Sequence, residues 1–214
     1  TCAYTTYGVK VVVSPDVPNN EGAFRPVRVV APEGSILNAR HPAPVAARHV
    51  IGHFLPHVVA GALGQALPER VMAEGSANIW AVQVAGKDLG GTPFTYIFFS
   101  SGGTGGRAGK DGLSATAFPS GVLGTPVEVV ESLSPLLVER KELRPDSGGA
   151  GRYRGGLGQT IALRVRTAEP FTCSVLCDRT RTPARGFLGG EPGALGGVLI
   201  DGVPPSNQKG EQLL

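Results

Sequence analysis

The segment 146–158 constrains the fold of this chain more than any other stretch. It reads Asp-Ser-Gly-Gly-Ala-Gly-Arg-Tyr-Arg-Gly-Gly-Leu-Gly and places six glycines, two arginines and one carboxylate within thirteen residues. Glycine costs about 0.5–1 kcal/mol relative to alanine inside a helix or strand, so such a cluster suits a backbone that needs positive φ or passes close to another group. The segment therefore predicts a shaped loop.

Glycine and proline are abundant along the whole chain. Gly 32 and Pro 18 in 214 residues approach the composition of low-complexity segments. Here, however, they punctuate apolar runs, and 41% hydrophobic with 17% charged residues is an ordinary globular balance. We expect a folded core joined by tight turns and shaped loops, including a second glycine-rich loop at 101–112.

Charge and cysteine content narrow the functional classes. The net charge of +3 is mild and the basic residues are scattered, which gives little support to nucleic-acid binding. No apolar run approaches the ~18 residues of a membrane span. Cys2, Cys173 and Cys177 form no paired framework, which indicates a reducing compartment. We therefore expect a cytoplasmic protein without a nucleic-acid or membrane partner and, because its only methionine is Met72, a piece of a longer chain.

Strand patterns outnumber helical patterns, and regular alternation of strand and helix is absent. This favours an α+β fold dominated by antiparallel pairing. The strand at 171–177 is expected to neighbour the strand at 159–166. Strands are predicted at 3–13, 26–30, 76–84, 94–100, 136–142, 159–166, 171–177 and 198–200.

Two helices are predicted. Apolar residues recur at helical spacing over 44–67, where Pro56 should kink or split the helix because proline removes one backbone hydrogen bond. A shorter helix is expected at 125–132, with Thr125 as its N-cap and Glu128 completing a capping box.

Local motifs give weaker indications of chemistry. Asp-Ser-Gly-Gly at 146–149 is similar to the nucleophile segment of chymotrypsin-like proteases, but no histidine segment supplies a base for Ser147. The spacing of His49, His53 and His57 would stack three imidazoles on one helix face, which is a weak alternative metal site. Pro56 interrupts that register, and no carboxylate lies on the same face.

Several ordered segments together resemble the hydantoinase B/oxoprolinase family, and the resemblance covers nearly the whole chain. They are 17–22 with 31–38 (Val-Pro-Asn-Asn-Glu-Gly and Ala-Pro-Glu-Gly-Ser-Ile-Leu-Asn), the helix that contains Arg48 and leads into Ala-Leu-Pro at 66–68, 125–131 (Thr-Pro-Val-Glu-Val-Val-Glu), 146–158, and 185–193 (Arg-Gly-Phe-Leu-Gly-Gly-Glu-Pro-Gly).

This resemblance implies that residues 1–214 are the C-terminal portion of a subunit that opens cyclic amides such as 5-oxoproline or hydantoins. It implies a hydantoinase A-like partner that uses ATP and Mg²⁺, no cofactor bound by this portion, and a divalent metal possible in an N-terminal half that is absent here. Relatives in this family include subunits of acetone and acetophenone carboxylases, so the resemblance does not determine which reaction is catalysed. His57 stands where the family usually has aspartate.

The two glycine-rich loops are the predicted site within this portion. Backbone N–H groups at Gly102, Gly103, Gly148 and Gly149 would face an anionic substrate or phosphorylated intermediate, because consecutive glycines can form amide nests. Arg152 and Arg154 would bind the same group bidentately. Asp111 and Asp146 would orient the arginines or transfer a proton. In the alternative interpretation both loops are structural, and the chain is a scaffold or subunit-interface module.

Overall fold

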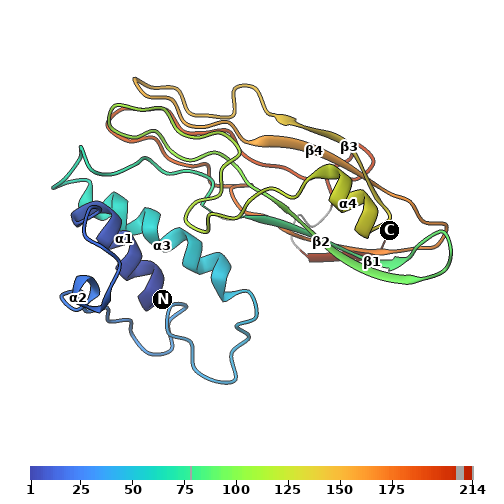
Figure 1. Cartoon of the computed structure of the whole chain (residues 1–214), viewed down its shortest axis with the longest axis horizontal. Coiled ribbons are helices and arrows are strands. Elements are labelled where there is room, and N and C mark those ends of the chain that lie inside the picture. Colours follow the sequence, from blue (N-terminus) through green and yellow to red (C-terminus); the bar gives the residue numbers. More distant parts are fainter. Residues whose placement is uncertain (78, 206–209, 214) are drawn as a thin grey trace.

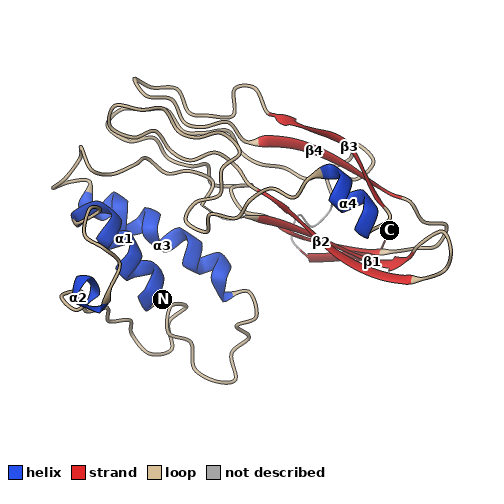
Figure 2. Ribbon diagram, viewed as in Figure 1, coloured by secondary structure: helices blue, strands red, loops and turns tan. Residues whose placement is uncertain are grey.

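A computed structural model describes residues 1–77, 79–205 and 210–213. Three helices, α1 (Cys2–Val13), α2 (Glu21–Phe24) and α3 (Arg48–Leu63), form a helical part on one side of the molecule, and the strands with α4 (Val127–Leu133) lie on the other (Figures 1 and 2). The expected combination of helices with antiparallel sheet is confirmed. None of the helices within the described ranges is long and apolar enough to cross a membrane.

The strands form two antiparallel sheets. The larger sheet has the order β2-β1-β5-β6, and the smaller pairs β3 with β4. The predicted neighbours 159–166 and 171–177 are therefore not paired, because β4 pairs with β3 and β5 pairs with β1 and β6. The strands are β1 (Trp80–Lys87), β2 (Pro93–Ser100), β3 (Leu136–Leu143), β4 (Gln159–Val165), β5 (Thr172–Leu176) and β6 (Gly210–Leu213). The strand predicted at 76–84 thus begins later, at Trp80, and residue 78 of that prediction lies outside the described residues.

The main core lies where the two sheets and α4 meet. Val84 of β1, Phe98 of β2, Val130 of α4 and Leu136 of β3 are buried together. Partly buried residues of β4 and β5 pack against them, so both sheets contribute to one apolar cluster. The glycine-rich segments connect or follow these strands, so the packed sheets and α4 hold the ends of the segments in place.

The prediction of a strand at 3–13 is wrong, because these residues form α1. Its contacts with α3 recur every four residues: Tyr4 meets Gly52, Gly8 meets Pro56 and Val59, and Val12 shares a buried cluster with Ala60. A Cβ at Gly8 or Gly52 would overlap the opposite helix, so these glycines let the helices approach closely. This packing outweighs the strand preference of the β-branched residues.

The helix predicted at 44–67 is shorter than expected and is not split. It runs over Arg48–Leu63 with Pro56 inside it. The residues before Arg48 form an exposed loop that follows α2, and those after Leu63 form turns. Burial of Leu55, Pro56 and Ala60 against the rest of the helical part supports the helix where proline removes a backbone donor.

Three other local predictions are corrected. Residues 26–30 belong to an irregular segment, and at 198–200 there is only an isolated bridge from Ile200 to Val203. Both stretches are short, and pairing partners rather than composition decide whether such residues form strands. The predicted capping box is absent, because α4 begins at Val127 with Pro126 as N-cap, while the Thr125 carbonyl accepts a hydrogen bond from Lys141 Nζ.

Candidate functional site

The glycine-rich segments lie side by side as extended chains at one end of the molecule, above the helical part in the view of Figure 1. Direct backbone hydrogen bonds join them. The Gly156 amide donates to the Thr104 carbonyl at 2.9 Å, the Gly112 amide donates to the Arg154 carbonyl at 2.7 Å, and the Glu191 amide donates to the Ala150 carbonyl at 2.8 Å. The loops 102–112, 146–158 and 186–193 are therefore one packed unit, hereafter the glycine layer.

Close backbone contact explains several glycines of this layer, while Gly109 and Gly189 have positive φ values of 82° and 84°. A Cβ added at Gly103 would overlap the Gly156 carbonyl, one at Gly148 would overlap the Gly155 carbonyl, and one at Gly149 would overlap the Glu191 carbonyl. At Gly102 the added atom would meet the Ser76 side chain at 2.5 Å. The four glycines predicted to bind substrate thus have a packing role, and their role toward a substrate stays a prediction.

Serine side chains also stabilise the layer through hydrogen bonds with the backbone. Ser147 Oγ donates to the Arg144 carbonyl at 2.7 Å and accepts from the Gly158 amide at 2.8 Å. Ser114 Oγ accepts from the Leu157 amide at 3.0 Å. Both hydroxyls form hydrogen bonds with the backbone. Ser147 therefore stabilises a turn, as short polar side chains commonly do in loops.

The two predicted acidic residues occupy different parts of this layer. Asp111 Oδ1 accepts a hydrogen bond from the backbone amide of Arg154 at 2.8 Å and so ties the two predicted loops together. Asp146 lies in the exposed turn that follows β3 and has a left-handed φ of 55°. Asp111 orients the backbone of Arg154 rather than its guanidinium, while a catalytic role for either aspartate stays a prediction.

Arg152 and Arg154 are exposed at the tip of the layer, and two further cations join them. Arg107 and Lys110 exchange backbone hydrogen bonds in a tight hairpin that lies against Tyr153 and Arg154, since a Cβ on Gly106 would approach the Tyr153 carbonyl at 2.6 Å. Sequence reasoning missed these two cations, although they lie inside the predicted loop at 101–112. We call Arg107, Lys110, Arg152 and Arg154 the basic rim.

No carboxylate forms a salt bridge with a basic-rim side chain within the residues that the structure describes. Arg107 Nη2 donates to the Asp111 carbonyl at 3.3 Å, and its Nε is buried without a partner. The Arg152 guanidinium lies 5.6 Å from the centre of the Tyr153 ring, as in a cation–π contact. The rim is therefore a set of cations available to an anionic group.

A second charged cluster, also missed from sequence, lies between α3 and the glycine layer. Arg179 donates to Glu74 Oε2 at 3.1 Å and to the Gly75 carbonyl at 3.1 Å, and its guanidinium lies 5.0 Å from the Phe54 ring. Arg185 donates to Glu74 Oε1 from both Nε and Nη2. Burial would raise the pKa of Glu74, but hydrogen bonds from Arg185 and the charge of Arg179 lower it below its usual value.

The three histidines of α3 do not converge on a common point. The rings of His49 and His53 are 5.7 Å apart at a steep angle, and the His57 ring packs edgewise on Phe118 at 5.5 Å. Burial, followed by the charge of Arg179, lowers the pKa of His57 to about 4, so the imidazole is neutral near pH 7. Across the described residues, no three His, Cys, Asp or Glu side chains are grouped so that they could hold a metal ion.

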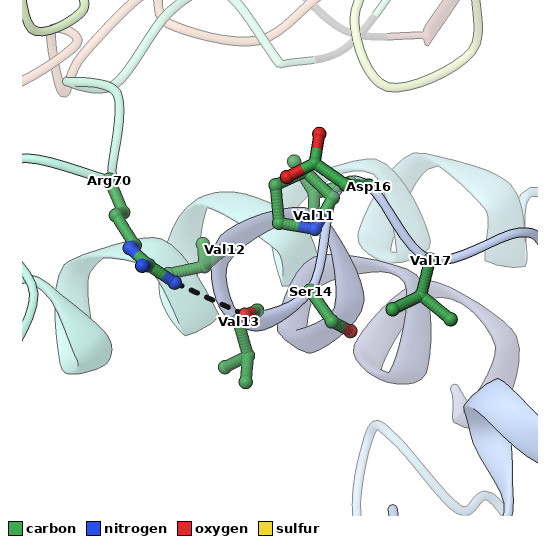
Figure 3. A pocket seen from close by; sticks show the side chains of 8 residues that line it. Val11, Val12, Val13, Ser14, Asp16, Val17 and Arg70 are labelled. Carbon is green, nitrogen blue, oxygen red and sulfur yellow. Dashed lines mark hydrogen bonds between the residues drawn. The ribbon is translucent and has the colours of Figure 1, made fainter.

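A surface pocket of about 450 Å³ lies away from these residues, at the C-terminal end of α1. Three valines of the helix line it, followed by the turn that carries Asp16 and Val17. Figure 3 shows Arg70 reaching to the Val13 carbonyl, with a hydrogen bond of 3.3 Å. None of the predicted site residues lines this pocket.

Comparison with known proteins places the chain among longer relatives. The family described as hydantoinase B/oxoprolinase matches residues 1–213. An uncharacterized protein of Methanocaldococcus jannaschii is 36% identical over 206 residues, covering 94% of this chain and 35% of that protein. A putative D-/L-hydantoinase subunit of a Pseudomonas species is 34% identical over 184 residues, covering 86% of this chain and 30% of that protein. The chain thus spans about a third of the length of these relatives.

A solved structure shares the fold over part of this chain. It is an acetone carboxylase in its nucleotide-free state, with a TM-score of 0.53 and 30% sequence identity. The match covers 63% of this chain and 18% of the carboxylase chain.

Proposed function

Because the chain belongs to the hydantoinase B/oxoprolinase family, we propose that it is part of an enzyme that opens cyclic amides, of the hydantoin or 5-oxoproline type. The family match over 1–213 is the observation that carries this proposal. The Pseudomonas relative named as a hydantoinase component supports it. Ring opening of a stable amide needs activation of its carbonyl, which the proposal assigns to ATP.

The proposal places ATP and Mg²⁺ in a hydantoinase A-like partner subunit. The described residues of this chain offer no grouping of three metal-ligating side chains. A divalent metal, where this subunit needs one, is proposed to lie in the part of the longer relatives that this chain does not cover. The cytoplasm is the proposed location of the assembly.

Within this chain, the proposal assigns recognition of an anionic group to the basic rim. Arginine guanidinium groups bind carboxylate and phosphate through paired hydrogen bonds. Arg152 and Arg154 are exposed, and the hydrogen bond from the Arg154 amide to Asp111 fixes the backbone that carries them. Asp146 and the glycine amides complete the predicted site.

Reconstitution tests this function. The intact assembly, containing the full-length subunit and its A-like partner, is assayed for ATP-dependent opening of hydantoin and 5-oxoproline, with ATP-dependent acetone carboxylation measured in parallel. Ring opening that needs both subunits and ATP supports the proposal. Carboxylation without ring opening overturns it and favours the carboxylase reaction of the solved relative.

A scaffold role is the second candidate, and one observation favours it. Three of the predicted substrate-binding glycines, Gly103, Gly148 and Gly149, contact neighbouring backbone directly, and the fourth, Gly102, contacts the Ser76 side chain. A scaffold predicts that Arg152→Ala and Arg154→Ala leave kcat/KM of the assembled enzyme unchanged. A substrate site predicts a loss of at least about tenfold, equivalent to about 1.4 kcal/mol of transition-state binding.

A further inference from the structure

The basic rim concentrates positive charge on a small area. Its four cations come from two neighbouring segments of the glycine layer, and they outnumber the three carboxylates of that layer, Asp111, Asp146 and Glu191. Asp111 already accepts a hydrogen bond from the Arg154 amide. A surface with this excess of unpaired cations is complementary to an acidic group outside the described chain.

The backbone under these cations is fixed in place. The hairpin of Arg107 and Lys110 has two mutual backbone hydrogen bonds, and the Gly112 amide donates to the Arg154 carbonyl. Gly103 and Gly112 lie so close to Gly156 that a Cβ on either would overlap its backbone, so the two segments are packed directly against one another. Fixed charges lose less conformational freedom on binding than charges on mobile loops, which favours association.

Apolar side chains are exposed beside the cations. Tyr153 is 38% exposed between the two rim arginines, and Leu188 is 79% exposed. Leu188 also has a left-handed φ of 50°, which is unfavourable for a residue with a branched side chain. The segment that carries Leu188 lies against the rim segment, since the Glu191 amide donates to the Ala150 carbonyl.

The exposure of the rim side chains favours a macromolecule over a small anion. Small ligands are usually bound in concave sites that enclose most of their surface. The rim side chains at Lys110, Arg152 and Arg154 are exposed rather than enclosed. Arginine and tyrosine are, in contrast, among the residue types that contribute most to protein–protein interfaces.

We propose that the basic rim, with Tyr153 and Leu188, docks onto an acidic face of the A-like partner polypeptide. This inference rests on the proposed function for the existence of that partner. The rim cations would pair with carboxylates of the partner, and the two exposed apolar side chains would be buried between them. In this proposal the anionic groups that the rim recognises are carboxylates of the partner, and the rim holds the two subunits together.

The experiment measures association of the full-length subunit with the A-like subunit by sedimentation, at about 50 mM and about 300 mM NaCl. Arg152→Glu with Arg154→Glu should weaken association at least about tenfold at low salt and flatten its salt dependence. Lys110→Glu tests the same surface from the other segment and should weaken binding in the same direction. Arg28→Glu, an exposed arginine on the loop after α2, serves as the control and should associate like the wild type.

Other outcomes overturn the inference. Normal association of both rim variants contradicts it. Normal association together with a raised KM for the anionic substrate also contradicts it and assigns the rim to a small ligand. If the wild-type subunits associate and open the ring while the rim variants associate like the control, the docking inference fails and the proposed ring-opening reaction stands.

Discussion

The backbone amide of Arg154 donates a 2.8 Å hydrogen bond to the carboxylate of Asp111, across 43 positions of the sequence. The contact fixes the relation between two loops that sequence reasoning had treated as separate parts of one site. It also gives Asp111 a structural role that does not depend on proton transfer.

The first prediction separates that structural role from a catalytic one. Asp111→Ala should lower the free energy of unfolding by about 1 kcal/mol, because it removes one hydrogen bond at an exposed position. Asp111→Asn keeps an acceptor oxygen and should restore most of that loss, as measured by urea denaturation. In the assembled enzyme, Asp111→Asn should also retain kcat; a large loss of kcat with normal stability would instead assign proton transfer to Asp111.

The second prediction concerns the glycine layer. Gly103→Ala should destabilise the chain by about 3 kcal/mol or more, because its methyl group would overlap the Gly156 carbonyl, which belongs to a hydrogen-bonded backbone that cannot move away. Gly61→Ala is the matched control, since it lies exposed in α3 with no atom within 4 Å of the added Cβ, and it should stabilise by about 0.5–1 kcal/mol. Equal unfolding midpoints for the two variants would contradict close packing as the cause.

Sequence patterns located most strands and both glycine-rich loops, because local alternation and glycine clusters carry that information. They failed at α1, where contacts of Gly8 with Pro56 and Val59 of a distant helix decide the conformation. They also failed to join β5 to β1, because pairing across about ninety residues leaves no local signal. Arg107 and Lys110 lay within a predicted loop, yet only its packing against Tyr153 and Arg154 shows that they extend the basic rim.

The third prediction tests the partly buried ion pair of Glu74. The side chains of Glu74 and Arg179 are 17% and 13% exposed, and Glu74→Gln would leave the Arg179 guanidinium without its counter-charge. We expect a loss of about 3 kcal/mol in the free energy of unfolding. The exposed pair of Arg40 and Glu33 is the comparison, and Glu33→Gln should cost less than about 1 kcal/mol. Similar losses for the two variants would show that burial does not strengthen the Glu74 pair.

The fourth prediction follows from the lowered pKa of His57. The unfolded chain binds a proton at the usual pKa of 6.5, whereas the folded chain binds it near 4, so the unfolded state holds more protons between these values. The stabilisation from neutral His57 is therefore fully present above about pH 6.5, and the free energy of unfolding falls by about 2 kcal/mol from pH 7 to pH 5.

Glu74 contributes in the same direction at lower pH, because its pKa is lowered below 4.5 and its ion pairs are lost as it is protonated. Urea denaturation between pH 7 and pH 5 measures this dependence above the pH range in which Glu74 is protonated. His57→Leu should flatten the dependence in this range, while His49→Leu on the exposed side of the same helix should retain it. A steep dependence that persists in His57→Leu would assign the acid sensitivity to another group and would contradict a neutral, buried imidazole at the junction of α3 with Arg179.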